Sequence, residues 1–286
     1  MKIGVMAESF RAGLEGGLKA AAELGAQGVQ IYARHGKTDL CNLNAAERSA
    51  LKRRIGDAGL ELAAVVGGMG GYGLERQEDN ARHVDHLKGA MELALELGCK
   101  VLTDHIGVVP SEPSHPRHAV MAGALERIGR YAESVGASFA IETGPEPAEV
   151  LRGLLDDLGM QRSVGVNFDP ANLVMVFGAD VVQAVRALGP YIVHTHAKDG
   201  VNLQPVDAEV LYHAFAEGGI KGFHAGDYLR EVPLGEGGVH FETYLDALSE
   251  AGYDGYLTIE REVGDNPRKD IEQAAAFLRE LLAARA

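Results

Sequence analysis

The stretch YIVHTHAKDG, residues 191–200, decides how the rest of the chain is interpreted. Its apolar start predicts a buried β-strand, and a buried parallel strand is normally apolar along its whole length. This strand ends instead in two histidines, a lysine and an aspartate. Alternate side chains of a strand share a face, so His194 and His196 point one way and Thr195 points the other. Such histidines are often core residues that hydrogen-bond to their neighbours, so a functional interpretation requires polar groups at the ends of other strands.

Short apolar segments alternate with helical patterns along the whole chain. The predicted strands are residues 2–8, 27–32, 60–66, 99–105, 137–142, 164–169, the opening stretch and 255–260. The predicted helices are residues 13–25, 44–59, 79–98, 118–135, 148–158, 180–188, 241–251 and 268–284. Strict alternation without an interior linker predicts an α/β fold of one domain, residues 1–286, closed as a (β/α)8 TIM barrel. An open doubly wound sheet is the alternative, but no nucleotide-binding fingerprint follows the first strand.

Composition and charge argue against several classes of binding partner. The formal net charge of −14 would repel a phosphate backbone, so nucleic acid is a disfavoured partner. No apolar run approaches the roughly 20 residues that span a bilayer, and the N-terminus lacks the pattern of a signal peptide. Cys41 and Cys99 are widely spaced, which predicts neither a disulfide framework nor a zinc ribbon. We therefore expect a soluble, cytoplasmic protein without a membrane partner.

Two irregular segments are expected near a binding pocket. Residues 67–74, GGMGGYGL, contain five glycines in eight positions. They lack the G-K-[ST] end of a phosphate-binding loop, which favours a flexible loop over the mouth of a pocket. Residues 201–238 form the longest insertion between two predicted strands and are expected to cover the same mouth.

The last four predicted strands each end in a side chain that can bind a metal. These terminal residues are Glu142, Asp169, His196 and Glu260. Because the carboxyl ends of barrel strands build the active site, all four are expected at one mouth. Any one of them could instead cap a helix or pair with an arginine. Together, three carboxylates would repel one another unless they were protonated or held by a positive group. A divalent cation removes that repulsion and explains the histidine, and the donor set suits Mn²⁺ first, then Mg²⁺ or Co²⁺, with Zn²⁺ also compatible.

Further polar residues near the predicted strand ends are candidates for contacts with a substrate. They are His105, Lys198, Asp199, Glu8 and Tyr32. Each could touch the substrate or orient a metal ligand, and an ordinary loop or salt-bridge position is the alternative for each of them.

Four motifs carry a resemblance to a known family over nearly the whole chain. They are HTHAKD (194–199), NFDPAN (167–172), IETG (141–144) and the run VPLGEGGVHFETYLDALSEAGYDGYLTIE (232–260). The chain resembles the xylose isomerase-like superfamily of divalent-metal sugar isomerases and epimerases. This superfamily includes ketose 3-epimerases, inosose isomerases and dehydratases, hydroxypyruvate isomerases and endonuclease IV-type enzymes. The resemblance maps the metal ligands onto the same four strand-end residues, with the second histidine of the pair as the ligand.

The resemblance also implies a reaction. In the ketose epimerases the two glutamates, here Glu142 and Glu260, transfer protons on opposite faces of the substrate. The metal polarises a ketone and its neighbouring hydroxyl, and a glutamate removes the α-proton to give an enediolate. A small ketose or keto-polyol is thereby epimerised or isomerised. Many relatives carry histidine three positions after the aspartate, where this chain has Asn172, which can hydrogen-bond a hydroxyl but cannot carry a proton. Lys198 could replace the substrate-binding arginine of the family.

Three other functions compete with an isomerase or epimerase. An inosose or dehydroshikimate dehydratase-like lyase would begin with the same proton abstraction, and the sequence does not separate the two. An endonuclease IV-like repair enzyme needs further histidine ligands and a basic face, both of which are missing. A non-catalytic binding subunit is disfavoured because an uncompensated carboxylate cluster is costly to retain. The lack of an arginine-rich or glycine-loop phosphate site favours a non-phosphorylated sugar or polyol. Relatives often form dimers or tetramers, so assembly into a homo-oligomer remains open.

Overall fold

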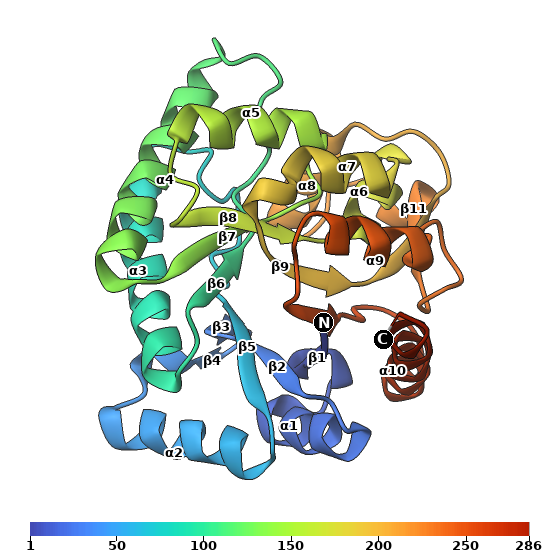
Figure 1. The fold of residues 1–286 in the computed structure, drawn as a ribbon. Coiled ribbons are helices and arrows are strands. Elements are labelled where there is room, and N and C mark those ends of the chain that lie inside the picture. The colour runs from blue at the N-terminus through green and yellow to red at the C-terminus, as the bar shows by residue number, and fades with distance from the viewer. Residues whose placement is uncertain (286) are drawn as a thin grey trace.

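The barrel predicted from the alternation of strands and helices is present. The computed structural model describes residues 1–285, in which eight parallel strands close into a barrel in the order β1-β12-β9-β8-β7-β6-β5-β2 (Figure 1). Its strands are β1 (Lys2–Met6), β2 (Gly28–Tyr32), β5 (Glu61–Val66), β6 (Val101–Asp104), β7 (Ser138–Glu142), β8 (Val164–Phe168), β9 (Ile192–Ala197) and β12 (Tyr256–Ile259). Each strand lies within a predicted one and is shorter by one to four residues, because the ends leave the hydrogen-bonded ladder first.

The predicted helices surround the barrel. They are α1 (Gly13–Leu24), α2 (Ala45–Asp57), α3 (Asn80–Leu97), α4 (Pro116–Val135), α5 (Ala148–Leu158), α7 (Val181–Leu188), α9 (Phe241–Glu250) and α10 (Pro267–Ala283). Capping residues determine where several of these helices begin or end. The Asn44 side chain accepts from the amides of Ala46 and Glu47 at the start of α2. Gly25 and Gly98 end α1 and α3 in the left-handed conformation, with φ of +73° and +97°.

Two helices and two hairpins were not predicted. They are helix α6 (Pro170–Phe177), helix α8 (Ala208–Ala216), the β3 (Arg34–His35) and β4 (Thr38–Asp39) hairpin, and the β10 (Asp199–Asn202) and β11 (Leu229–Val232) hairpin. Helix α6 follows β8 directly, because Pro170 fits the first helical turn and the Asp169 side chain accepts from the Asn172 amide at 2.9 Å. Almost all of α6 is buried, so its sequence lacks the amphipathic pattern by which an exposed helix is recognised.

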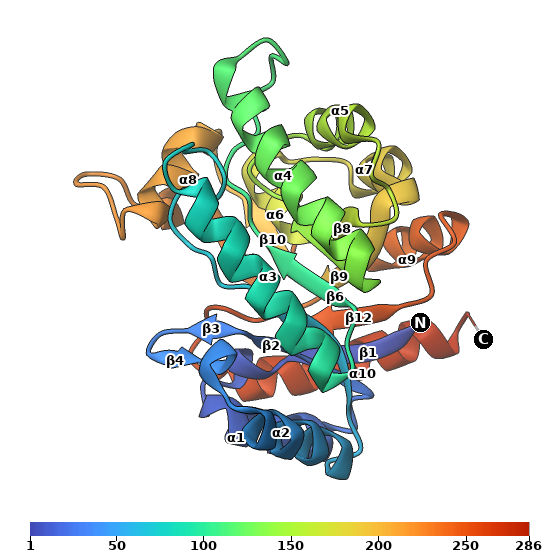
Figure 2. The same ribbon diagram turned by 90° about the vertical axis from the view of Figure 1, so that its left-hand side faces the viewer.

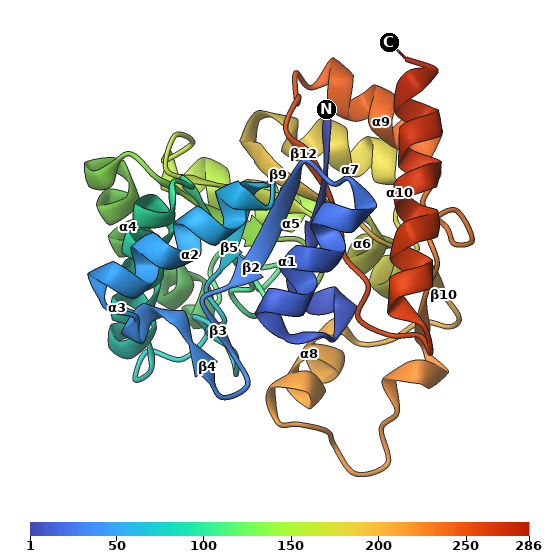
Figure 3. The ribbon, with the colours of Figure 1, turned by 90° about the horizontal axis from the view of Figure 1, so that it is seen from below.

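The insertion after β9 lies at the mouth of the barrel. Its two ends pair as the antiparallel strands β10 and β11, and α8 lies between them. Figures 2 and 3 show α8 and the β3–β4 hairpin on the same side of the barrel, and Figure 2 shows β6 pointing toward that side. The carboxyl ends of the parallel strands open there. Among residues 1–285, no helix is both long enough and apolar enough to cross a membrane.

A polar layer lies inside the barrel below its mouth. Gln30 on β2 is fully buried, and its side-chain amide donates to the Thr103 hydroxyl on β6 at 3.0 Å. His194 on β9 lies 2.9 Å from the Gln30 amide oxygen and 3.1 Å from the Thr258 hydroxyl on β12. These hydrogen bonds connect strands that are not consecutive in the chain, and they lie directly below the strand-end residues.

Candidate metal centre

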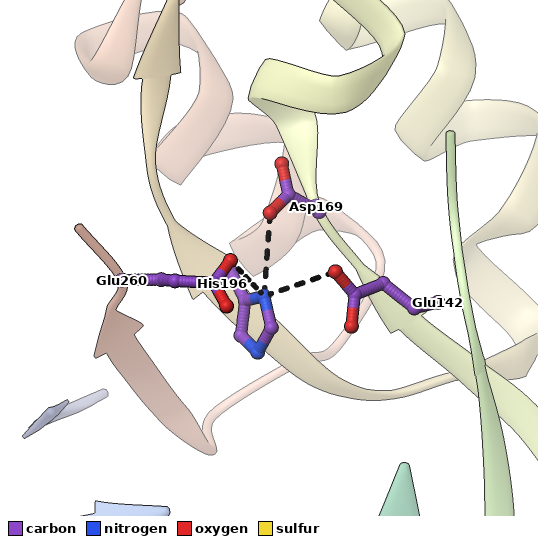
Figure 4. Close-up of side chains that lie close together, drawn as sticks. All are labelled: Glu142, Asp169, His196 and Glu260. Atoms are coloured by element: carbon purple, nitrogen blue, oxygen red, sulfur yellow. Dashed lines mark hydrogen bonds and ion pairs between the residues drawn. The ribbon is translucent and has the colours of Figure 1, made fainter. Parts of the chain in front are cut away.

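Four strand ends bring their side chains to one point at the mouth. Glu142 ends β7, Asp169 follows β8, His196 lies in β9, and Glu260 follows β12. Each offers one ligand atom, and these atoms all lie within 4.8 Å of one another in a buried cluster (Figure 4). The four residues are the set that the strand-end pattern singled out, and the cluster could hold a divalent metal ion.

The Nδ1 atom of His196 is the centre of this cluster. It lies 3.2 Å from Asp169 Oδ2, 3.2 Å from Glu260 Oε2 and 3.6 Å from Glu142 Oε1 (Figure 4). Burial alone would lower the pKa of His196, but the charges of Glu260 and Glu142 raise it well above its usual value. Three carboxylates around one ring nitrogen therefore demand a positive charge, which either a proton or a metal cation can supply.

Two amide side chains lie below the ring of His196. Its Nε2 is 3.1 Å from the Gln30 amide oxygen, which accepts, and 3.1 Å from the Asn167 amide nitrogen, which donates. A divalent cation bound at Nδ1 would leave the ring proton on Nε2, where it would donate to Gln30, the usual arrangement of a metal-binding imidazole. The Asn167 amide lies beside the same nitrogen and donates to Glu142 Oε2 at 3.2 Å. The donor chemistry and this orientation both fit a hard divalent cation.

The role of Gln30 leads to a prediction. Gln30→Leu should weaken Mn²⁺ binding by about 10–100-fold, because the group that orients the His196 ring is removed. Gln30→Glu, which retains an acceptor oxygen, should keep most of the affinity. Gln27→Leu is the matched control, since the Gln27 side chain accepts from the Ile3 amide, away from the cluster. Mn²⁺ titration followed by electron paramagnetic resonance measures the dissociation constant, and equal affinities for wild type and Gln30→Leu would contradict the orienting role of Gln30.

A buried ammonium group supports the outer side of Glu260. Lys198 Nζ donates to Glu260 Oε2 at 3.0 Å and to the Glu262 carboxylate, and it lies 3.9 Å from Glu231 Oε2. Burial raises the pKa of Glu260, but the charges of Lys198 and His196 outweigh it and the net pKa is lowered. These two hydrogen bonds use two of the three N–H groups of Lys198, so one N–H is left that could bind a substrate. That role stays a prediction.

Two predicted substrate contacts lie against Glu142. His105 Nε2 is 3.4 Å from Glu142 Oε1, and the Asn172 amide donates to the same oxygen at 3.4 Å and to the Thr143 carbonyl at 3.2 Å. Burial lowers the pKa of His105, but the charge of Glu142 raises it to about 9. The His105 side chain is 42% exposed, so its outer edge faces the open mouth.

The other two predicted contacts lie where β1 and β2 end. Glu8 Oε1 accepts from the Tyr32 amide at 3.2 Å, and within residues 1–285 its buried Oε2 has no hydrogen-bond partner. Burial raises the pKa of Glu8 to about 7. The pKa of Tyr32 is raised well above its usual value by burial and by the charges of Glu260 and Glu142. The structure thus places these five of the six candidate residues around the mouth, and their roles in binding stay predictions.

Asp199 has a structural position. Its carboxylate accepts hydrogen bonds from the backbone amides of Gly200, Gly235, Gly237 and Val239, at 2.8–3.0 Å. These bonds tie the two ends of the β10–β11 hairpin together. This agrees with the loop interpretation of Asp199, and His194, whose pKa burial lowers to about 3, is likewise the core histidine of the pair.

Sequence reasoning missed four residues of the site. Gln30 and Asn167 orient the metal-ligand candidates from below, and a single amide inside an apolar strand was a signal that could have found either. Tyr212 and Glu146 line the mouth from outside the barrel strands. No local pattern distinguishes Tyr212 from other residues of the insertion, because its position depends on how α8 folds over the strands.

The sequence and the fold were compared with known proteins. The profile of a family described as "Xylose isomerase-like TIM barrel" matches residues 18–281. An uncharacterized protein of Methanocaldococcus jannaschii is 26% identical over 188 residues, which are 62% of this chain and 56% of that protein. The inosose dehydratase of Lacticaseibacillus casei is 30% identical over 146 residues, which are 50% of this chain and 46% of that enzyme. The matched region therefore spans about half the length of these curated relatives.

Solved structures with the same fold extend the comparison to the whole chain. A xylose isomerase domain protein from Planctomyces limnophilus is 29% identical with a TM-score of 0.80, covering 98% of this chain and 96% of that one. A D-tagatose 3-epimerase-like protein (21% identity, TM-score 0.75) covers 100% of both chains. The probable 3-DHS dehydratase of Bacillus anthracis (18% identity, TM-score 0.75) covers 98% of this chain and 99% of its own. The last two likenesses concern the fold. The family profile, which matches nearly the whole chain, shows that this chain belongs to the xylose isomerase-like TIM barrel family.

Proposed function

We propose that this protein is a divalent-metal-dependent isomerase or epimerase that acts on a small ketose or keto-polyol. The convergence of three carboxylates on Nδ1 of His196 carries the proposal, because it is an arrangement that a cation stabilises. Mn²⁺ is the proposed ion, since three oxygen donors and one imidazole suit it well, and Mg²⁺, Co²⁺ or Zn²⁺ are alternatives.

We assign the proton transfer to the two glutamates. A divalent cation bound at the cluster would act as a Lewis acid on the carbonyl and neighbouring hydroxyl of a substrate. Glu142 and Glu260 approach from opposite sides, because β8 and β9 lie between their strands β7 and β12. In the proposed reaction one carboxylate accepts the proton α to the carbonyl, and the other returns a proton. Return to the opposite face of the same carbon gives the epimer, and return to the neighbouring carbon gives the isomer.

Neighbouring side chains hold each glutamate in a defined orientation. His105 and Asn172 contact Oε1 of Glu142, Asn167 donates to its Oε2, and Lys198 donates to Oε2 of Glu260. Such contacts fix the direction of each carboxylate. The carboxylate can therefore face the substrate in the geometry that proton transfer requires.

A lyase is the second candidate, and the inosose dehydratase of Lacticaseibacillus casei favours it through 30% identity over 146 residues. Dehydration starts with the same α-proton abstraction, after which the C–O bond to a β-hydroxyl breaks and water leaves. Both reactions predict exchange of the α-hydrogen with solvent. The mass of the product separates them, because a dehydratase product is lighter by one water.

Metal content is the first measurement. Purified protein supplied with Mn²⁺ should retain close to one equivalent per chain by elemental analysis, and His196→Ala should lose it because the only nitrogen donor of the cluster is removed. His240→Ala is the control, since His240 is an exposed residue before α9. The loaded protein is then incubated in D₂O with ketoses and inososes, and deuterium incorporation is followed by mass spectrometry. A wild type without metal and without exchange on any substrate would refute the proposed function.

A further inference from the structure

The insertion after β9 contributes a side chain to the mouth of the barrel. We call residues 203–228, which contain α8, the cap segment. Helix α8 buries only Leu211 and Ala214 among its described residues, so a hydrophobic core does not explain its position. Figures 2 and 3 show the cap segment projecting from the side of the barrel where the strands open. Other contacts must therefore hold α8 there.

A network of charged groups provides those contacts. Arg117 at the start of α4 donates to both carboxylate oxygens of Glu209 at 2.9 Å and to Glu75 Oε2 at 3.0 Å. His213 Nε2 lies 3.1 Å from the same Glu75 oxygen, and Tyr72 hydrogen-bonds Glu217. Glu75 and Arg117 are only 5% and 15% exposed, so these pairs are shielded from solvent in part. The network connects α8 to the loop after β5 and to α4.

This position directs Tyr212 of α8 toward the metal-ligand candidates. The Tyr212 ring packs edge-on against the His105 ring, with 5.8 Å between their centroids, and His105 in turn contacts Glu142. The Tyr212 hydroxyl lies over Gly144 in the loop after β7, where a Cβ would overlap it. Gly144 also has a φ of +152°, which disfavours a larger residue. A single side chain thus separates Tyr212 from the cluster.

The hydroxyl of Tyr212 is a free hydrogen-bond donor. Burial, then the charges of Glu146 and Glu142, raise the pKa of Tyr212 well above its usual value, so the hydroxyl keeps its proton. It takes part in none of the hydrogen bonds that residues 1–285 form with one another. Glu146, whose charge acts on Tyr212, is 2% exposed, and its Oε1 has no partner within the same residues. A polar group left unpaired at such a position costs free energy unless a ligand or water satisfies it.

We infer that Tyr212 is a specificity-determining residue whose hydroxyl hydrogen-bonds a substrate hydroxyl remote from the carbons held at the cluster. The inference rests on the proposed function for the orientation of the substrate. It names the substrate class more closely: an uncharged polyhydroxy ketone long enough to reach from the cluster to the cap segment. A three-carbon ketone would occupy the cluster without reaching Tyr212. An anionic group is disfavoured at this position, because Glu142 and Glu75 lie nearby and the nearby cations already pair with carboxylates.

Binding of two probes to the Mn²⁺-loaded protein tests the inference. D-Fructose has hydroxyls remote from its ketone, and dihydroxyacetone has none. Tyr212→Phe removes one oxygen and keeps the ring against His105, so it should weaken D-fructose binding by about 3–10-fold and leave dihydroxyacetone binding unchanged. Tyr228→Phe is the matched control, because Tyr228 belongs to the same segment and stacks on Phe223 at 5.2 Å. Isothermal titration calorimetry gives both dissociation constants for each variant.

The possible outcomes separate this inference from the proposed function. Selective loss of D-fructose affinity in Tyr212→Phe supports the inference, even where D₂O exchange shows no reaction and the proposed function fails. Equal losses for both probes would assign Tyr212 a structural role and overturn it. Unchanged D-fructose affinity would also overturn it. A wild type that binds neither D-fructose nor myo-inositol at 100 mM would overturn it as well, because the mouth would then not accept polyhydroxy compounds.

Discussion

Replacing Glu142 with glutamine should slow the exchange of a substrate α-hydrogen with solvent by about 10²–10⁴-fold, the usual contribution of a positioned general base. An amide cannot accept the proton, whereas its oxygen can still accept from Asn172, so the local structure should be kept. The measurement is the loss of the α-proton signal in D₂O by nuclear magnetic resonance, with the Mn²⁺-loaded protein and the ketose or inosose that the wild type exchanges fastest.

Two comparisons make this result specific to the carboxylate. Glu149→Gln makes the same change at an exposed position at the start of α5 and should exchange at the wild-type rate. The metal content of Glu142→Gln is measured in parallel, so that a loss of metal is not mistaken for the loss of a base. If Glu142→Gln exchanged at the wild-type rate, another residue would have to be the base.

The second large effect concerns stability. Lys198→Met should lower the free energy of unfolding by about 3–5 kcal/mol, because removing one partner of a buried ion pair leaves the other charge uncompensated. Lys198 and Glu260 are 3% and 6% exposed, whereas Glu262 is 60% exposed and contributes little. Urea unfolding of the metal-free protein, followed by circular dichroism, gives the free energy.

A second substitution tests the cause of this loss. Lys198→Met/Glu260→Gln removes both charges and should recover part of the stability, since no carboxylate is left unpaired at that position. Lys221→Met, in the exposed part of the cap segment, is the matched control and should change stability by less than about 0.5 kcal/mol. A Lys198→Met protein as stable as this control would show that solvent reaches Glu260 and that the pair is not buried in solution.

Local patterns predicted most of the barrel. Runs of apolar residues with Gly or Pro at their ends mark short buried strands, and caps such as Asn44 and Gly98 mark helix ends, because these signals act over a few residues. Helix α6 was missed for a local reason as well. Its first residue is Pro170, and a proline that can end a strand also suits the first turn of a helix.

The composition of the metal centre could be predicted, but its organisation could not. Parallel strands of a barrel all open at one end, so the terminal residues Glu142 and Glu260 had to lie at a common mouth. The distances to His196 Nδ1, and the hydrogen bond from Nε2 to Gln30, depend on strand register and on the closure of the barrel. A shift of one residue in β9 would turn His196 out of the barrel.

The sequence by itself therefore determined the alternation of strands and helices, the closed barrel and the four candidate ligands, because each follows from side-chain patterns within one segment. Only the tertiary structure decided which nitrogen of His196 faces the carboxylates and that Tyr212 reaches the mouth. Tyr212 packs on His105, and Arg117 pairs with Glu209, 92 residues away in the chain. Contacts between such distant segments form only when the whole chain folds, so no pattern within either segment encodes them.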